Sequence, residues 1–152
     1  MSHVRQQIRE AVITELKKIT AFGNRVYGYR GTIQKTAPYV IVRTGEEEIV
    51  VEEGTFGSDG HPTLMREVQI SIEVRTKAAA DLDDTMDGYA VSIEEKMAGT
   101  ALNSLAKYVL PGSMRIETNE DNERIEQDAA LLTMTFPVRY RTKEGSPETA
   151  IL

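Results

Sequence analysis

The sequence predicts a single α+β domain in which two helices lie on one face of a mainly antiparallel mixed sheet. Three observations lead to this fold class. A helical period of apolar residues opens the chain and returns at residues 82–97. Two stretches alternate between apolar and polar side chains, namely residues 67–75 of an expected strand at 65–75 and residues 132–140. Hairpin-like connections join most strand-like runs, which favours antiparallel neighbours. The chain has 152 residues, the usual size of one domain, and no repeat or linker divides it.

The first element is expected to be a helix that begins after Ser2 and ends before Gly23. The hydroxyl of Ser2 can cap the first turn, and Gly23 with Asn24 stops the helix. Charged residues occupy the face opposite the apolar one. The apolar positions are Val4, Ile8, Val12, Leu16 and Ile19.

Strands are expected next, at residues 25–30 and 39–43. Thr44-Gly45 can turn the chain back into a further strand at 46–52. Residues 53–62 are rich in Gly, Ser and Asp and predict a long loop or hairpin tip. The strand at 65–75 then has one face buried and one in water.

The second half of the chain predicts a helix at 82–97, capped by Gly99, and a modest strand at 113–118. An acidic connection follows, and then the second long alternating strand. Pro137 lies within that strand and has no amide donor, so either the strand lies at a sheet edge or its proline points outward. Residues 143–152 show no period, so a mobile tail is expected to follow a domain of residues 1–142.

Composition excludes several classes of function. The chain has no cysteine, which removes disulfides, thiolate nucleophiles and zinc–thiolate sites. The net charge is −6, and the basic residues are scattered rather than clustered, which disfavours tight binding of DNA. Neither a signal peptide nor a stretch of membrane-spanning length is recognised, so a soluble intracellular protein without a membrane partner is expected.

No motif carries catalytic, cofactor or metal chemistry. The Gly-rich stretch 54–60 lacks the Lys-Ser or Lys-Thr of a phosphate-binding loop. Residues 83–94 match the spacing of a calcium loop, but their apolar positions continue the helical period on both sides, so a helix is expected. His3 and His61 have no neighbouring ligand at metal spacing. We therefore expect no enzyme, no cofactor and no metal site.

The order of these features resembles the tail terminator proteins of long-tailed bacteriophages, the family that includes the minor tail protein U of phage lambda. The likeness covers residues 1–142 and consists of pattern and length. The features that carry it are the helix Arg5-x-x-Ile8-x-x-x-Val12-x-x-x-Leu16, the runs Arg25-Val26-Tyr27 and Ala37-Pro38-Tyr39-Val40-Ile41-Val42, the strand Arg66–Arg75, the helix segment Asp87–Glu94 and the closing strand Leu132–Thr142.

The resemblance implies a virion structural protein, assembled in the host cytoplasm into a hexameric ring in the tail or neck region. Such a ring caps the tail tube, ends its polymerisation and provides a docking surface for the head. The implied partners are further copies of the chain, the tail tube protein and head-completion or connector proteins, with DNA passing through without tight binding. Lumen-facing acids are expected among Glu46, Glu47, Glu48, Asp83, Asp84 and Asp87, and a partner-contact loop at Gly54, Phe56, Gly57 and His61.

Three alternatives stay open at this point. One is another head–tail connector, such as a neck or head-completion protein. A second is a small ligand-binding or enzymatic α+β domain, which would need a pocket of about 300 Å³ or more with convergent polar groups. A third is an adaptor that stays monomeric.

Overall fold

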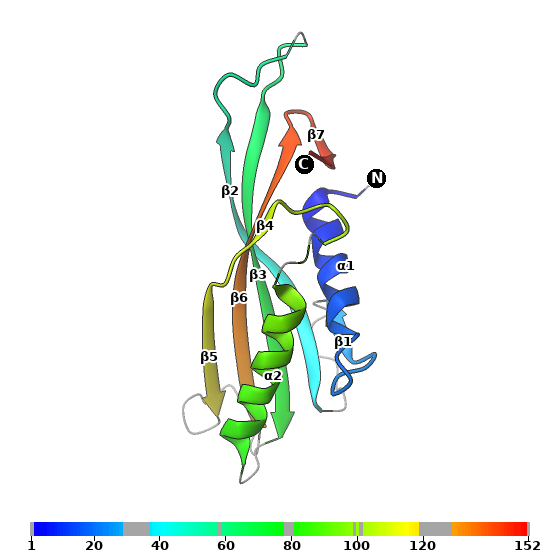
Figure 1. Ribbon diagram of the computed structural model, residues 1–152, viewed down its shortest axis with the longest axis vertical. Coiled ribbons are helices and arrows are strands. Elements are labelled where there is room, and N and C mark those ends of the chain that lie inside the picture. Colours follow the sequence, from blue (N-terminus) through cyan, green and yellow to red (C-terminus); the bar gives the residue numbers. More distant parts are fainter. Residues whose placement is uncertain are drawn as a thin grey trace.

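The computed structural model describes residues 2–28, 37–57, 59–77, 81–98, 100, 102–118 and 129–151. They form two helices and a seven-stranded sheet (Figure 1), which confirms the predicted α+β class. The elements in chain order are α1 (Val4–Leu16), β1 (Val26–Gly28), β2 (Tyr39–Val51), β3 (Thr63–Lys77), α2 (Leu82–Met97), β4 (Tyr108–Val109), β5 (Ser113–Thr118), β6 (Ala129–Lys143) and β7 (Ser146–Ile151).

The sheet is built around the long antiparallel pair of β3 and β6. On the far side of β3 lies β2, and β1 pairs with β2 as the parallel neighbour. The far side of β6 is shared by three strands in succession, with β7 near its C-terminal end, β4 in the middle and β5 near its N-terminal end. The sheet twists so strongly that β2 is its left-hand strand at the top of Figure 1 and lies to the right of β3 at the bottom.

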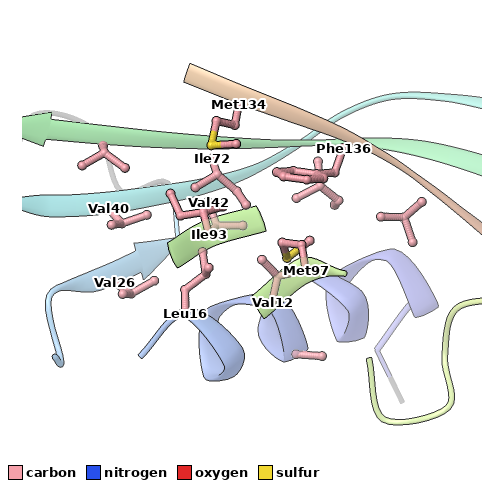
Figure 2. Close-up of a cluster of buried hydrophobic side chains, with 14 of the residues drawn as sticks. Val12, Leu16, Val26, Val40, Val42, Ile72, Ile93, Met97, Met134 and Phe136 are labelled. Atoms are coloured by element: carbon pink, nitrogen blue, oxygen red, sulfur yellow. The ribbon is translucent and has the colours of Figure 1, made fainter. Parts of the chain in front are cut away.

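The core lies between one face of this sheet and both helices (Figure 2). The alternating residues of β3 and β6 point into it as predicted, because successive strand residues face opposite sides. Val68, Ile70, Ile72 and Val74 meet Leu132, Met134, Phe136 and Val138 there, together with Val12 and Leu16 of α1 and Met86 and Ile93 of α2.

The ends of α1 differ from the sequence prediction. The N-cap is His3 rather than Ser2, and its Nδ1 accepts a hydrogen bond from the amide of Arg5 at 3.1 Å. The helix ends at Leu16, earlier than expected, and a turn then carries Ile19 and Phe22 into the core. Gly23 closes that turn with a positive φ of 54°.

The predicted turn at Thr44-Gly45 is wrong, because β2 runs through both residues. Thr44 pairs with Ile70 and Glu47 with Val68, so β2 advances three residues while β3 advances two. This extra residue is a β-bulge, which bends a strand without ending it. Arg5 binds the bulge from α1, since its Nη2 donates to the carbonyl of Gly45 at 2.8 Å.

Pro137 does not mark an edge strand, because β6 has neighbours on both sides. The carbonyl of Pro137 accepts from the amide of Leu110 at 2.9 Å, so its ring nitrogen faces the same side. On that side Pro137 faces the gap between β4 and β5, where no described strand pairs with β6, so the backbone N–H that proline lacks is not required there. The gap also needs glycine, since a Cβ on Gly112 would lie 2.3 Å from the carbonyl oxygen of Thr135.

The prediction of an irregular tail after residue 142 is also wrong. Ser146–Ile151 form β7, which pairs with the end of β6 after a turn at Gly145 with a φ of 83°. Gln7 of α1 holds β7 in place by donating to the carbonyl of Glu148 at 2.9 Å.

Residues 83–94 lie within α2, as the helical period predicted. The predicted acidic connection at 119–128 and the predicted cap Gly99 lie outside the described residues. Over the ranges that the structure describes, neither helix is long and apolar enough to cross a membrane.

Candidate functional site

The most distinctive surface feature is the outer part of the β2–β3 hairpin, residues 46–67, which we call the arm. Figure 1 shows it extending beyond both helices at one end of the molecule. Within the arm, its strands pair from Glu48–Glu67 to Val51–Leu64. The amide of Thr63 donates to the hydroxyl of Thr55 at 2.9 Å and so connects the two sides of the loop between the strands.

The arm exposes apolar side chains. Ile49, Val50, Val51 and Phe56 are between 47% and 64% exposed, and they are four of the seven large exposed apolar residues among those described. Ile49 and Val51 point to one face of the hairpin and Val50 to the other. Apolar side chains scattered singly on a surface are normal, but a group on one projection is typical of an interaction site.

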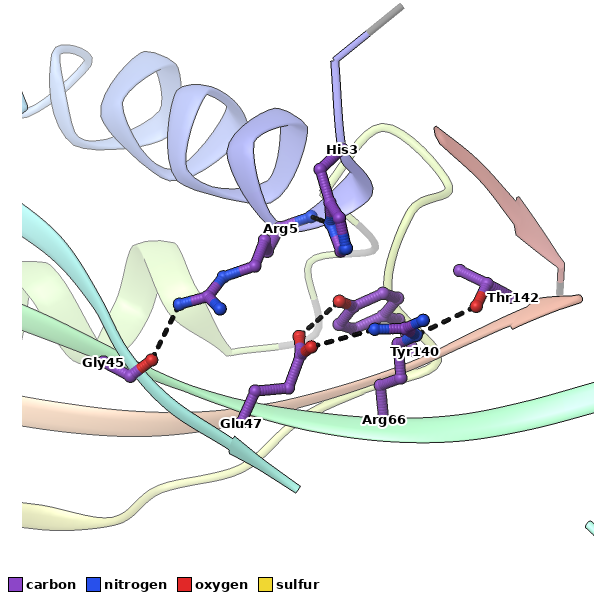
Figure 3. A network of polar contacts seen from close by, with 7 residues as sticks. All are labelled: His3, Arg5, Gly45, Glu47, Arg66, Tyr140 and Thr142. Carbon is purple, nitrogen blue, oxygen red and sulfur yellow. Dashed lines mark hydrogen bonds and ion pairs between the residues drawn. The ribbon is translucent and has the colours of Figure 1, made fainter. Parts of the chain in front are cut away.

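A buried polar cluster joins the arm to β6 (Figure 3). Nη1 of Arg66 pairs with Oε2 of Glu47 at 3.0 Å, and its Nε donates to the hydroxyl of Thr142 at 2.9 Å. The hydroxyl of Tyr140 donates to the other oxygen of Glu47. The side chains of Arg66 and Glu47 are only 10% and 6% exposed. Each polar group of the cluster thus has a partner, as burial requires.

Ion pairs continue this attachment toward the tip of the arm. Arg141 binds Glu52 at 2.6 Å, Lys143 binds Asp59 at 2.5 Å, and Nδ1 of His61 lies 3.2 Å from Glu144. The hydrogen bond from Lys143 lowers the pKa of Asp59 below 3.8. Such partly exposed pairs contribute little singly, but here they follow one another along the same hairpin.

We expect Tyr140 to make the stability of the fold fall at alkaline pH. Burial, and then the Glu47 carboxylate, raise the pKa of Tyr140 well above its usual value of 10.0. The folded pKa exceeds the unfolded one, so this contribution is complete below about pH 10 and is lost as the pH rises from there toward the folded pKa. Tyr140→Phe should remove this pH dependence, and should cost about 1–3 kcal/mol at pH 7 because Glu47 loses a donor.

Urea unfolding at pH 7 to 11 measures both effects. The wild type should lose stability above pH 10 faster than the Phe variant does. Parallel curves for the two proteins would show that Tyr140 ionises equally in the folded and unfolded chains.

The predicted acids are not brought together on one surface. Glu46 and Glu48 are exposed at the base of the arm, whereas the bulge turns Glu47 inward to Arg66. Asp83, Asp84 and Asp87 are exposed on the first turns of α2, at the opposite end of the molecule in Figure 1. The Glu47 carboxylate is therefore buried and paired within the subunit, and a lumen-facing role for the predicted acids stays a prediction.

The predicted partner-contact loop lies at the tip of the arm. Gly54, Phe56, Gly57 and His61 are all there, and Phe56 and His61 are exposed. Sequence reasoning missed the apolar strand residues beside them, because Ile49-Val50-Val51 is typical of a buried strand. The signal that was available is the run of glutamates around these residues, since charge on both sides of a short apolar run disfavours burial.

A hollow of about 600 Å³ lies between α1 and the strands β1 and β2. Its charged groups are engaged, since Arg9 donates to the hydroxyl of Thr44 at 3.2 Å and Arg43 pairs with Glu73 at 3.4 Å. Among the described residues that line it there is no His, Ser, Tyr or Lys. The lining does include the Thr44 hydroxyl and the Glu10 carboxylate, but Thr44 accepts from Arg9 and Glu10 accepts from Gln6 at 3.0 Å, so these two described groups are not shown paired with each other.

The chain was also compared with known proteins. No family model and no curated protein matches it. Among solved structures, a chain from the virion of a native gene transfer agent (GTA) particle is similar, with a TM-score of 0.49 and 20% sequence identity. The alignment covers 90% of each of the two chains.

Proposed function

We propose that this chain is a structural subunit of a bacteriophage tail, namely a tail terminator that forms a hexameric ring on the tail tube. In this proposal the ring ends polymerisation of the tube and offers a surface to head-completion or connector proteins. The observation that carries the proposal is the arm, which projects from the sheet and exposes apolar side chains on both of its faces. The resemblance of the sequence to tail terminators suggests which assembly the arm serves.

The arm suits docking because it is attached firmly as well as exposed. An isolated two-stranded hairpin is marginally stable in water. Here Tyr140 and Thr142 of β6 bind the Glu47–Arg66 pair, and Arg141 of β6 binds Glu52. Its shape is therefore set before a partner arrives, which reduces the entropy lost on binding.

The proposal further holds that the chain acts by assembly rather than by catalysis and that DNA passes the ring without tight binding. For the first point, the hydroxyl and the carboxylate that line the hollow beside α1 have other partners, since Thr44 accepts from Arg9 and Glu10 accepts from Gln6. For the second, the net charge of −6 and the exposed Glu46 and Glu48 disfavour contact with phosphates.

The test changes the apolar surface of the arm during phage assembly. Val50→Ser with Phe56→Ser removes two exposed apolar side chains and should leave stability within about 0.5 kcal/mol, because neither residue is buried. We expect overlong or headless tails by electron microscopy. The matched control is Val91→Ser on α2, which is 54% exposed and lies outside the arm. It should give normal particles.

The outcomes separate the alternatives. Overlong tails support a terminator, whereas headless tails of normal length indicate a neck or head-completion protein. Normal infectious particles from the arm variant would remove the arm from the mechanism. Normal particles without any copy of the chain would refute the whole proposal.

A further inference from the structure

A second exposed apolar group lies on the other edge of the sheet. Tyr108 of β4 and Met114 of β5 are 52% and 51% exposed. With Ile49, Val50 and Val51 of the arm, they make five of the seven large exposed apolar side chains in the part of the chain that the structure describes. The exposed apolar surface is thus concentrated on two edges, which we call the arm edge (residues 46–53) and the β4–β5 edge (residues 107–117).

Among the described strands, each of these two edges pairs with a neighbour on one side only. Beyond Val42, β2 pairs with β3 alone among the described strands, because β1 reaches only Val40–Val42. On the other edge, β5 pairs with β6 alone within those same ranges. Unpaired strand edges are templates for the addition of a strand from another chain.

The two edges carry opposite charge. Glu46, Glu48 and Glu53 are exposed on the arm edge, and within the described ranges they form no ion pair. The β4–β5 edge carries Lys107, which is exposed, and Arg115, whose side chain is 74% exposed while it binds Glu117 at 2.7 Å. Glu117 is the one acid of the β4–β5 edge and its side chain is only 13% exposed, so the exposed charges of the two edges are opposite in sign.

The twist of the sheet brings both edges to the same side of the molecule. In Figure 1 the upper part of β2 and the whole of β5 form the left-hand boundary, one at each end of the long axis. A second copy, turned by a two-fold axis beside this boundary, would place its β4–β5 edge against the arm edge of the first. Its own arm edge would meet the β4–β5 edge of the first copy at the same time, as an isologous interface requires.

We propose that the free subunit pairs with a second copy of this chain through these two edges. The arm edge of each copy lies along the β4–β5 edge of the other, with Glu46 and Glu48 facing Lys107 and Arg115. This inference goes beyond the proposed ring, since it concerns the subunit before assembly. The pair covers the apolar arm that the ring would later present to other proteins.

Charge reversal tests the pairing. In a dimer of either variant, Glu48→Arg or Arg115→Glu, like charges face each other at both contacts. Each substitution should therefore raise the dimer Kd, measured by sedimentation equilibrium, about tenfold or more, which corresponds to 1.4 kcal/mol. Mixing the two variants should restore the wild-type Kd, because a heterodimer has one reversed pair and one native pair. The matched control is Glu95→Arg, at an exposed site on α2, which should leave the Kd unchanged.

Three results would overturn the proposal: a wild-type chain that is monomeric at all concentrations, one that forms only larger rings, or a dimer that the reversals do not weaken. Circular dichroism of each variant shows that it is folded. Because Arg115→Glu leaves the arm intact, it should still end tail growth normally. Failure of the dimer therefore appears in the sedimentation experiment, and failure of the proposed function appears separately in tail length.

Discussion

Replacing Arg66 by methionine should lower the free energy of unfolding by about 3–5 kcal/mol, because it leaves the Glu47 carboxylate buried without its cation. The volume of the side chain is nearly kept, so the loss reports on charge rather than on packing. Thr142 would lose its hydrogen bond to Nε in the same step. Urea denaturation of the variant and the wild type at pH 7 gives the difference directly.

The neighbouring pair of Arg139 with Glu67 is a matched control. Its nitrogen–oxygen distance is 2.7 Å, but the two side chains are 46% and 28% exposed. Arg139→Met should therefore cost less than about 1 kcal/mol. The double variant Glu47→Leu with Arg66→Met should recover part of the loss, because no unpaired charge then remains. Equal losses for Arg66→Met and Arg139→Met would contradict the assigned burial of the cluster.

Phe136→Ala should also cost about 3–5 kcal/mol, because it opens a cavity between β6 and the two helices. Phe136 is a core residue (Figure 2), and it pairs across the sheet with Ile70. Thermal or urea unfolding measures the loss. Phe56→Ala is the control, since the same side chain is exposed on the arm and its removal should change stability by about 0.5 kcal/mol or less. A loss below about 1 kcal/mol for Phe136→Ala would place it on the outer face of β6.

The parts of the fold that could be predicted are those in which a local pattern decides burial. The alternation along β3 and β6 predicted which residues face the helices, because a strand with one covered face must alternate. The helical period likewise placed residues 83–94 in α2 against a competing calcium-loop spacing. In both cases the information lies within a dozen consecutive residues.

The errors share a different cause, since each depends on a partner distant in the sequence. Thr44-Gly45 suits a turn, but pairing with β3 on both sides of it maintains the strand. Pro137 suits an edge, and only the gap between β4 and β5 makes it acceptable in the interior. Glu47 was taken as one of three equivalent acids, and the bulge together with Arg66 distinguishes it from its neighbours. The residues next to each of these positions in the sequence do not reveal which distant strand or side chain it will contact.

The continuous pairing of β3 with β6 has a mechanical consequence. The two strands pair over their whole length, from Thr63–Lys143 at the arm to Lys77–Ala129 at the far end. A pull on the arm along the strand direction therefore loads this entire ladder in shear, so that many backbone hydrogen bonds resist together instead of opening one after another. A force applied at the tip of the hairpin is therefore transmitted along β3 and β6 to the opposite end of the domain. No break in the pairing of these two strands separates the arm from the part of the sheet that the helices cover.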